Sequence, residues 1–322
     1  MVHPIGIGAM SFSDFYGATT EANSHAILDA AMAAGVSHID TANVYGMGKS
    51  ESAIGSYLQA RPEARDYFHI ATKGAIRRRE DGSGNYFDNS AAHLAAELDA
   101  SLTRLGVEAV DLYYVHRRDA AVPIEEVTET LAGLVQAGKA KSIGFSEIAP
   151  STLRRAHAVH PVAAVQSEYS LSTRSPEMGL VQTCAELGVA LVAFSPVGRS
   201  FLTDNPLNFE AVQKIGFLKN NPRFVQPNFS ANITATAPFR ALAAEMGVAA
   251  AGLANAWLLA QGDHVIPIPG TRSVAHFREI LQGADLSLSA SDLAAIEAVL
   301  PIGWAHGDRY SAQQWVGPER YC

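Results

Sequence analysis

The chain has 322 residues, of which 48% are hydrophobic and 17% are charged, so it can bury a sizeable core and lacks the composition of a disordered segment. Its formal net charge of −8 argues against a general binder of nucleic acid or of membrane surfaces, but leaves room for a local basic pocket. The two cysteines, Cys184 and Cys322, lie far apart and lack metal-ligand spacing, which predicts neither a disulfide framework nor a zinc site.

Short apolar runs alternate with longer amphipathic runs along almost the whole chain. We expect strands at 4–8, 37–40, 68–73, 110–116, 141–146, 163–168, 190–195 and 264–269. The runs between and after them predict helices at 21–34, 50–59, 89–105, 124–137, 150–157, 176–187, 237–246 with 249–260, and 274–282. Each of the eight strands is therefore followed by a helix.

This alternation predicts the fold class. Nearly continuous apolar strands joined by helices indicate a parallel sheet that is buried on both faces, and eight such units favour a closed (β/α)8 TIM barrel over an open doubly wound sheet, which is the alternative. We expect one domain over 1–322, with an extra C-terminal helix at 289–299, where Ser289 and Asp292 have capping-box spacing. The stretch 198–234 after the seventh strand is too long for a routine connection and is a candidate lid.

Two apolar stretches bear on location. The beginning, "MVHPIGIGAM", lacks the charged region and apolar run of a signal peptide. The stretch "GVAAAGLANAWLLA" is shorter than the roughly 18 residues of a membrane-spanning helix. We therefore expect a cytoplasmic protein without a membrane partner.

Three short motifs fail or carry little weight. "GIGAMS" has Ser11 where a dinucleotide-binding fingerprint needs its third glycine. "GMGKS" resembles the end of a phosphate-binding loop, but Asn43 occupies the position of the first glycine, so the motif is rejected. The basic run "IRRRED" (76–81) is expected to be a solvated loop, with contact to an anionic ligand near the site mouth as the alternative.

Chemistry-bearing side chains gather at the ends of three neighbouring predicted strands. Asp40, Lys73 and His116 end the second, third and fourth strands, and Tyr45 follows on the loop above, so all four meet where barrel enzymes place their sites. The group suits proton transfer to or from a carbonyl or an alcohol. A nearby ammonium is expected to lower the pKa of a phenol from its usual value near ~10, Asp40 would keep Lys73 charged, and His116 could donate a hydrogen bond to the substrate oxygen.

Each of these residues also has an ordinary structural interpretation. Asp40 could cap a turn, Lys73 could reach solvent and His116 could be a core histidine, and only their coincidence at neighbouring strand ends favours a site. A metal held by His38, Asp40 and His116 is the other alternative, but no further His/carboxylate pair completes a ligand shell, so we expect no metal.

A series of motifs in chain order resembles the aldo-keto reductases. These are "HIDTANVYG", "ATK", "DLYYVH", "IGFSE", "VQSEYSL", "VAFSPVGRSFLT" and "IPIPGTR", and the resemblance runs from Ile5 to about Gln282. It implies a (β/α)8 barrel that binds NADP(H) across the C-terminal face and reduces aldehydes or ketones by hydride transfer. By the same resemblance Asp40, Tyr45, Lys73 and His116 correspond to the catalytic tetrad, with Tyr45 as general acid.

The resemblance also implies cofactor contacts. Ser146 and Gln166 match positions that hold the nicotinamide carboxamide, with Glu147 in place of a common asparagine, and Phe194 matches the position that stacks on the nicotinamide ring. The stretch from Pro196 to Leu202 matches the loop over the pyrophosphate, and the cofactor contacts in this region would include Ser195, Pro196, Val197, Gly198 and Arg199. The turn around the adenosine 2′-phosphate would include Gly270, Thr271 and Arg272, assisted by His276.

Several departures from the family pattern qualify these expectations. Ser200 replaces a common glycine, Ile280 stands where relatives often have asparagine near the adenine, and the usual N-terminal hairpin is not evident. The family also includes cofactor-binding regulatory proteins, the potassium-channel β-subunits, which are the alternative to a reductase. The sequence fixes neither the small-molecule carbonyl substrate, nor the direction of reaction, nor the oligomeric state.

Overall fold

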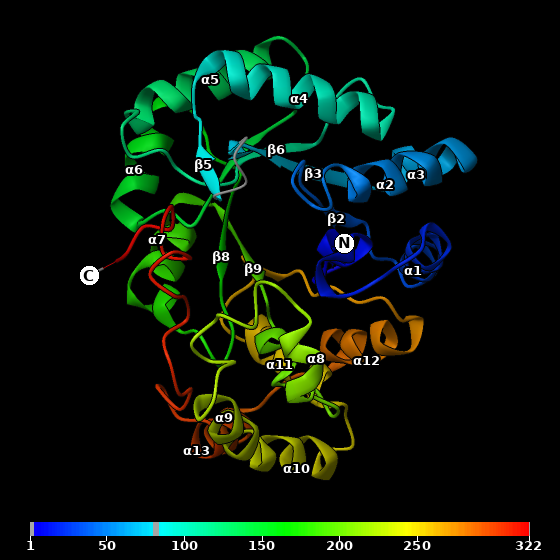
Figure 1. Ribbon diagram of the computed structural model, residues 1–322, viewed down its shortest axis with the longest axis vertical. Helices are drawn as coiled ribbons and strands as arrows, with labels where there is room; N and C mark the ends of the chain where they lie inside the picture. The colour runs from blue at the N-terminus through cyan, green and yellow to red at the C-terminus, as the bar shows by residue number, and fades with distance from the viewer. Residues whose placement is uncertain (1–2, 80–83, 322) are drawn as a thin grey trace.

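A parallel sheet of eight strands forms the centre of the protein, whose computed structural model describes residues 3–79 and 84–321 (Figure 1). Neighbouring strands follow one another in chain order around the sheet. They are β1 (Ile7–Gly8), β2 (His38–Asp40), β3 (His69–Gly74), β6 (Leu112–Val115), β7 (Ile143–Ser146), β8 (Ala164–Glu168), β9 (Ala190–Phe194) and β10 (Val265–Pro267). Each lies at a stretch where the sequence predicts a strand.

Hydrogen bonds close the sheet between its first and last strands. The backbone N–H of Gly6 donates to the carbonyl of Pro267 at 2.9 Å, and the N–H of Gly8 donates to that of Pro269 at 2.9 Å. The first strand thus lies between β2 and β10, and the (β/α)8 barrel is confirmed in place of the open sheet.

Helices surround the strands on the outside (Figure 1). Those that follow successive barrel strands are α1 (Glu21–Ala33), α2 (Lys49–Ala60), α4 (Ala91–Leu105), α5 (Ile124–Gln136), α6 (Pro150–Val159), α7 (Leu180–Leu187), α10 (Ala237–Glu245) with α11 (Ala250–Leu259), and α12 (Val274–Asp285). Their ends follow the sequence signals: Ser90 caps the start of α4, and Gly106 ends it in the left-handed conformation with φ 67°. The additional helix α13 (Ala290–Val299) begins with the predicted capping box of Ser289 and Asp292.

Helix α11 is buried along almost its whole length, and its residues are apolar except for Asn255. Gly252 on α11 and Gly283 on α12 let the two backbones meet, since a Cβ at Gly283 would lie 2.5 Å from the carbonyl oxygen of Gly252.

Within the described residues, no single helix is both long and apolar enough to cross a membrane, although the bent pair Asn228–Glu245 and Ala250–Leu259 satisfies length and composition together.

The sequence did not predict several short elements between the barrel units. After β3 a hairpin of β4 (Ile76–Arg78) and β5 (Asn85–Phe87) stands where we expected a solvated loop, with Arg77 and Arg79 against the ring of Tyr86. Residues 80–83, the end of that basic run included, lie outside the described residues. A further helix, α3 (Glu63–Tyr67), follows α2.

The long stretch after β9 is structured. It contains α8 (Phe209–Gln213) and α9 (Asn228–Ala235) and packs its own apolar cluster, in which the ring of Phe201 stacks on that of Phe224 with centroids 4.4 Å apart. Movement of this stretch as a lid stays a prediction.

Candidate active site

Four side chains meet at the carboxyl ends of β2, β3 and β6. The parallel register pairs Asp40 with Ala71, two residues before Lys73, so both side chains point to the same face of the barrel wall. The ammonium of Lys73 donates to the carboxylate of Asp40, to the carbonyl oxygen of Thr41 at 2.8 Å and to the hydroxyl of Tyr45 at 3.2 Å. The ring of His116 meets that of Tyr45 edge-on, with centroids 5.7 Å apart. We call Asp40, Tyr45, Lys73 and His116 the tetrad.

The charges of the tetrad are set by burial and by its own ion pair. Burial alone would lower the pKa of Lys73, but Asp40 and Tyr45 outweigh it and raise the pKa, so the ammonium stays charged. Burial, with the nearby charges of Arg117 and Lys73, holds the pKa of His116 well below its usual value, and the imidazole is therefore neutral at pH 7. Its Nδ1 is buried without a hydrogen-bond partner among the described residues.

The expected lowering of the Tyr45 pKa is wrong in its net direction. Lys73 does lower it, but burial raises the pKa by more, and the hydroxyl stays protonated at neutral pH. The sequence showed the neighbouring ammonium but not the extent of burial, since only 8% of the tyrosine remains exposed. A protonated phenol beside an ammonium is the form that a proton donor needs.

The residues expected at the nicotinamide carboxamide lie next to the tetrad and already have partners. The side-chain amide of Gln166 donates to the second carboxylate oxygen of Asp40 at 2.7 Å. The hydroxyl of Ser146 accepts from Arg117 at 2.9 Å, and Arg117 also donates to the carbonyl of His116 at 2.7 Å. These contacts help to fix the orientation of the tetrad.

Glu147 faces the protein rather than open space. One carboxylate oxygen accepts from Arg309, and the other accepts from the backbone N–H of Glu168 at 2.8 Å. The expectation that this carboxylate accepts from a cofactor carboxamide stays a prediction, and these two contacts would compete with it.

The loop after β9 carries its predicted residues at the same end of the barrel. Phe194 is half-buried at the end of the strand, and Ser195, Gly198 and Arg199 all have positive φ values near 55°. The guanidinium of Arg199 donates to Glu168 at 3.0 Å and to the hydroxyl of Tyr16 at 3.0 Å. Its side chain is therefore engaged inside the protein, while the neighbouring Pro196 and Val197 belong to the turn itself.

The predicted phosphate turn lies at the N-terminus of α12. Ser273 caps this helix by accepting from the N–H of His276, and Gly270, Arg272 and His276 are exposed. The guanidinium of Arg272 donates to the carbonyl of Ala18 at 3.2 Å, and Thr271 accepts from the N–H of Ser273. A helix N-terminus with an exposed arginine and histidine suits an anionic group.

Ile280 is part of the core instead of a cofactor surface. It is 4% exposed and packs with Ile5 and Ala251. The position at which relatives often carry asparagine thus supplies an apolar contact between α12 and the neighbouring elements.

The sequence did not predict that the C-terminal tail (residues 302–321) packs at this end of the barrel. In Figure 1 the red chain runs back from α13 toward α7. Its hydrogen bonds reach the loops after β7 and β8. The N–H of Glu319 donates to the carbonyl of Glu147 at 2.8 Å, Trp304 donates to the carbonyl of Leu171 at 2.8 Å, and Tyr321 lies 3.2 Å from the hydroxyl of Ser167. The tail has no helical or strand periodicity. Its arginine and aromatic residues were the only feature of the sequence that could have indicated that it packs against the barrel.

Within residues 3–79 and 84–321, no group of three His, Cys, Asp or Glu side chains could hold a metal ion. His38, considered above as a ligand with Asp40 and His116, has its Nε2 buried without a partner in the described part of the chain.

Comparisons with known proteins agree with this architecture. The model of the aldo/keto reductase family matches residues 4–301. The chain is 38% identical over 310 residues to the probable aldo-keto reductase 1 of Glycine max, covering 96% of this chain and 88% of that protein. It is 34% identical over 312 residues to the aldo-keto reductase yakc [NADP(+)] of Schizosaccharomyces pombe, covering 96% and 92%.

Solved structures show the same fold. A glycerol dehydrogenase from Gluconobacter oxydans superimposes with a TM-score of 0.81 at 26% identity, covering 92% of this chain and 91% of that one. The holo form of an aldo-keto reductase from Bacillus halodurans superimposes with a TM-score of 0.75 at 24% identity, covering 92% of both chains.

Proposed function

Because the chain belongs to the aldo-keto reductase family, we propose that it uses NADPH to reduce aldehydes or ketones to alcohols, with Tyr45 as the general acid. The observation that carries this proposal is the position of the Lys73 ammonium, which is buried between the carboxylate of Asp40 and the hydroxyl of Tyr45. Such a contact favours the phenolate that forms when the hydroxyl gives up its proton.

The residues present fit the cofactor. The exposed guanidinium of Arg272 and the N-terminus of α12 suit the 2′-phosphate that distinguishes NADPH from NADH. The hydroxyl of Ser146 and the amide of Gln166, beside the tetrad, can exchange hydrogen bonds with a carboxamide. When bound, the cofactor supplies the hydride that reduces the carbonyl carbon.

In this mechanism the tetrad transfers a proton to the substrate. Tyr45 donates its proton to the substrate oxygen as negative charge develops there, and Lys73 stabilises the resulting phenolate. Asp40 keeps Lys73 charged and oriented, and Gln166 holds the second oxygen of Asp40. The neutral imidazole of His116 can donate an N–H to the substrate oxygen without a competing ionisation near pH 7.

The test follows the loss of NADPH absorbance with an activated aromatic aldehyde for the native chain and for Tyr45→Phe. We expect turnover to fall by about 10²–10⁴-fold, because the proton donor is lost, while NADPH affinity measured by fluorescence stays nearly unchanged. Tyr67→Phe is the matched control, since that hydroxyl on α3 makes one hydrogen bond, to the carbonyl of Met32.

Two results would overturn the proposal. Full activity in Tyr45→Phe would remove Tyr45 from the mechanism. NADPH binding without turnover across a panel of aldehydes and ketones would instead support the cofactor-binding regulatory alternative.

A further inference from the structure

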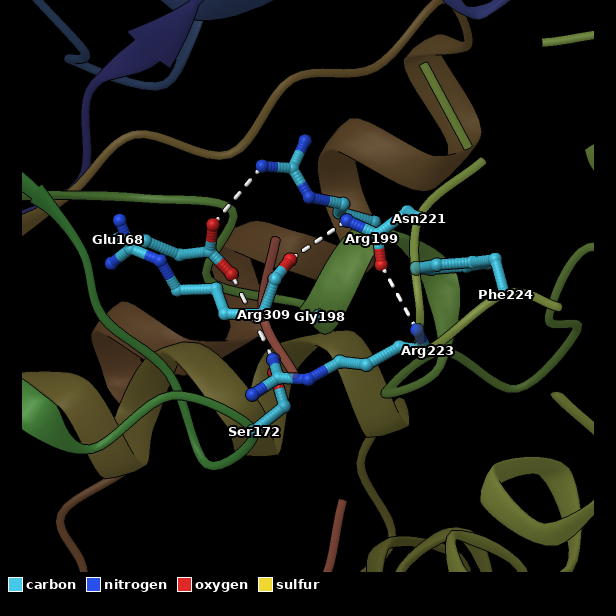
Figure 2. A pocket seen from close by; sticks show the side chains of 8 residues that line it. All are labelled: Glu168, Ser172, Gly198, Arg199, Asn221, Arg223, Phe224 and Arg309. Carbon is cyan, nitrogen blue, oxygen red and sulfur yellow. Dashed lines mark hydrogen bonds and ion pairs between the residues drawn. The ribbon is translucent and has the colours of Figure 1, made fainter. Parts of the chain in front are cut away.

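A small, partly open cavity lies between the end of β8, the loop after β9, the segment that precedes α9, and the C-terminal tail. Its volume is about 10 Å³, which is room for one water-sized species. Figure 2 shows three arginines converging on it from three different segments. We call it the arginine cavity; it is lined by Glu168, Ser172, Gly198, Arg199, Asn221, Arg223, Phe224 and Arg309.

The charges around the arginine cavity do not cancel. Arg199 pairs with Glu168 at 3.0 Å, and Arg309 pairs with Glu147. Arg223 lies 3.9 Å from Glu168, whose carboxylate is already shared, and donates to the hydroxyl of Thr173 at 2.8 Å. Three guanidinium groups thus face two carboxylates, which leaves an excess of one positive charge.

This excess is buried. The side chains of Arg199, Arg223 and Arg309 are 8%, 13% and 8% exposed, and those of both glutamates are 3% exposed. Proteins rarely bury a charge without a partner, because the interior solvates it poorly. The nearby Asp308 is exposed and accepts from the indole of Trp315 and from a backbone N–H, so it does not enter the cavity wall.

Individual groups in the arginine cavity also lack partners. The Nε of Arg309 is buried without a hydrogen-bond acceptor among the described residues, although Arg309 as a whole is only 7% exposed. Burial lowers the pKa of Arg223 more than the attraction of Glu168 raises it, and the charges of Arg309 and Arg199 lower it further. In contrast, nearby tyrosine and glutamate side chains raise the pKa of Arg199 and of Arg309 in spite of burial, so the charge left without a full partner is that of Arg223.

We propose that the arginine cavity binds one small monovalent anion of halide size, held by Arg223 and Arg309. A single negative charge matches the excess, and the space open to a water-sized species suits an ion of one atom. The site shares no residue with the phosphate turn at α12. It borders the predicted pyrophosphate loop through Gly198 and Arg199, but Arg223 and Arg309, which hold the anion, belong to other segments, so the proposal goes beyond the reductase activity. The bound anion links the C-terminal tail, through Arg309, to the segment before α9, through Arg223.

Thermal unfolding of the full chain tests this without any turnover measurement. The melting temperature is compared in sodium chloride, sodium bromide and sodium gluconate at equal ionic strength, so that general screening is the same. We expect Tm to be higher by about 3 °C in either halide, because an anion that binds the folded chain stabilises it. Equal melting temperatures in all three salts would overturn the proposal.

Two substitutions test the charge argument. Ser172→Asp places a carboxylate at the cavity wall, and Arg223→Gln removes the excess charge, so either change is expected to abolish the halide-dependent shift in Tm. Arg155→Gln is the control, because Arg155 pairs with Glu125 on the exposed surface, and it should keep the shift. A full shift in both cavity variants would contradict the site.

If neither cavity variant folds, a crystal structure of the native chain tests the proposal. Crystals grown in sodium bromide are expected to show an anomalous scattering peak between Arg223 and Arg309. Water alone in the arginine cavity, with no bromide peak, would overturn the proposal.

Discussion

The tetrad and the arginine cavity are two buried polar clusters at the carboxyl ends of the same barrel, and they balance charge differently. In the tetrad one ammonium meets one carboxylate, while Tyr45 and His116 are neutral, so every charge has its partner inside the cluster. In the arginine cavity three cations share two carboxylates. The tetrad therefore contains all the charges it needs for proton transfer, whereas the arginine cavity needs one negative charge from a bound ion.

The largest effect is expected from breaking the ion pair of the tetrad. Lys73→Met leaves Asp40 buried without its cation and removes the charge that stabilises the Tyr45 phenolate. We expect turnover to fall by about 10³-fold and the free energy of unfolding to fall by about 3–5 kcal/mol. Steady-state kinetics and urea unfolding measure the two. Native-like kcat would show that the ammonium has no part in proton transfer.

The corresponding change at the arginine cavity is Arg309→Met, which leaves Glu147 buried without its guanidinium. We expect a loss of about 3 kcal/mol in the free energy of unfolding. Adding Glu147→Gln should restore part of it, because the unpaired carboxylate is then gone. Additive losses in the double variant, measured by urea unfolding, would mean that the two side chains do not act as a pair.

Lowering the pH is expected to destabilise the arginine cavity through the carboxylate of Glu168. Burial alone would raise its pKa, but Arg199, Arg309 and Arg223 outweigh burial and lower it to about 2. A folded-state pKa below the unfolded value stabilises the protein above about pH 4.5, and this stability is lost as the pH falls toward 2. We expect a loss of about 3 kcal/mol over that window at most.

Glu168→Gln should flatten this acid dependence, since the titrating group is removed. Glu125→Gln, at an exposed ion pair, serves as the control and should retain most of it. An unchanged slope of unfolding free energy against pH in Glu168→Gln would show that the carboxylate is not held ionised by the arginines.

The smallest effect concerns the exposed phosphate turn, which lies outside both clusters. Arg272→Gln is expected to weaken NADPH binding by about tenfold and NADH binding much less, because one charge-assisted contact is lost. Arg278→Gln, further along the same helix and also exposed, is the matched control. Fluorescence titration with both cofactors measures the ratio, and an equal loss for NADPH and NADH would place the 2′-phosphate elsewhere.

The alternation of apolar runs was sufficient to predict the barrel, because each strand needs a helix to cover it and eight such units close on themselves. The spacing of Asp40, Lys73 and His116 at strand ends was likewise sufficient to predict that they meet, since parallel strands end at one face. That the whole chain, 1–322, is a single domain stays a prediction. The hairpin β4–β5 was missed because a basic run in sequence looks solvated whether or not its backbone pairs.

The sequence by itself determined which residues follow each strand, and therefore which side chains the barrel brings together at its carboxyl end. Only the tertiary structure decided how those side chains are charged and with what they pair. Burial reversed the expected direction of the Tyr45 pKa shift, and the tail brought Arg309 to Glu147 across 162 positions of the chain. The physical reason is that local spacing fixes position along an element, whereas desolvation and ion pairing depend on every segment that packs around a group.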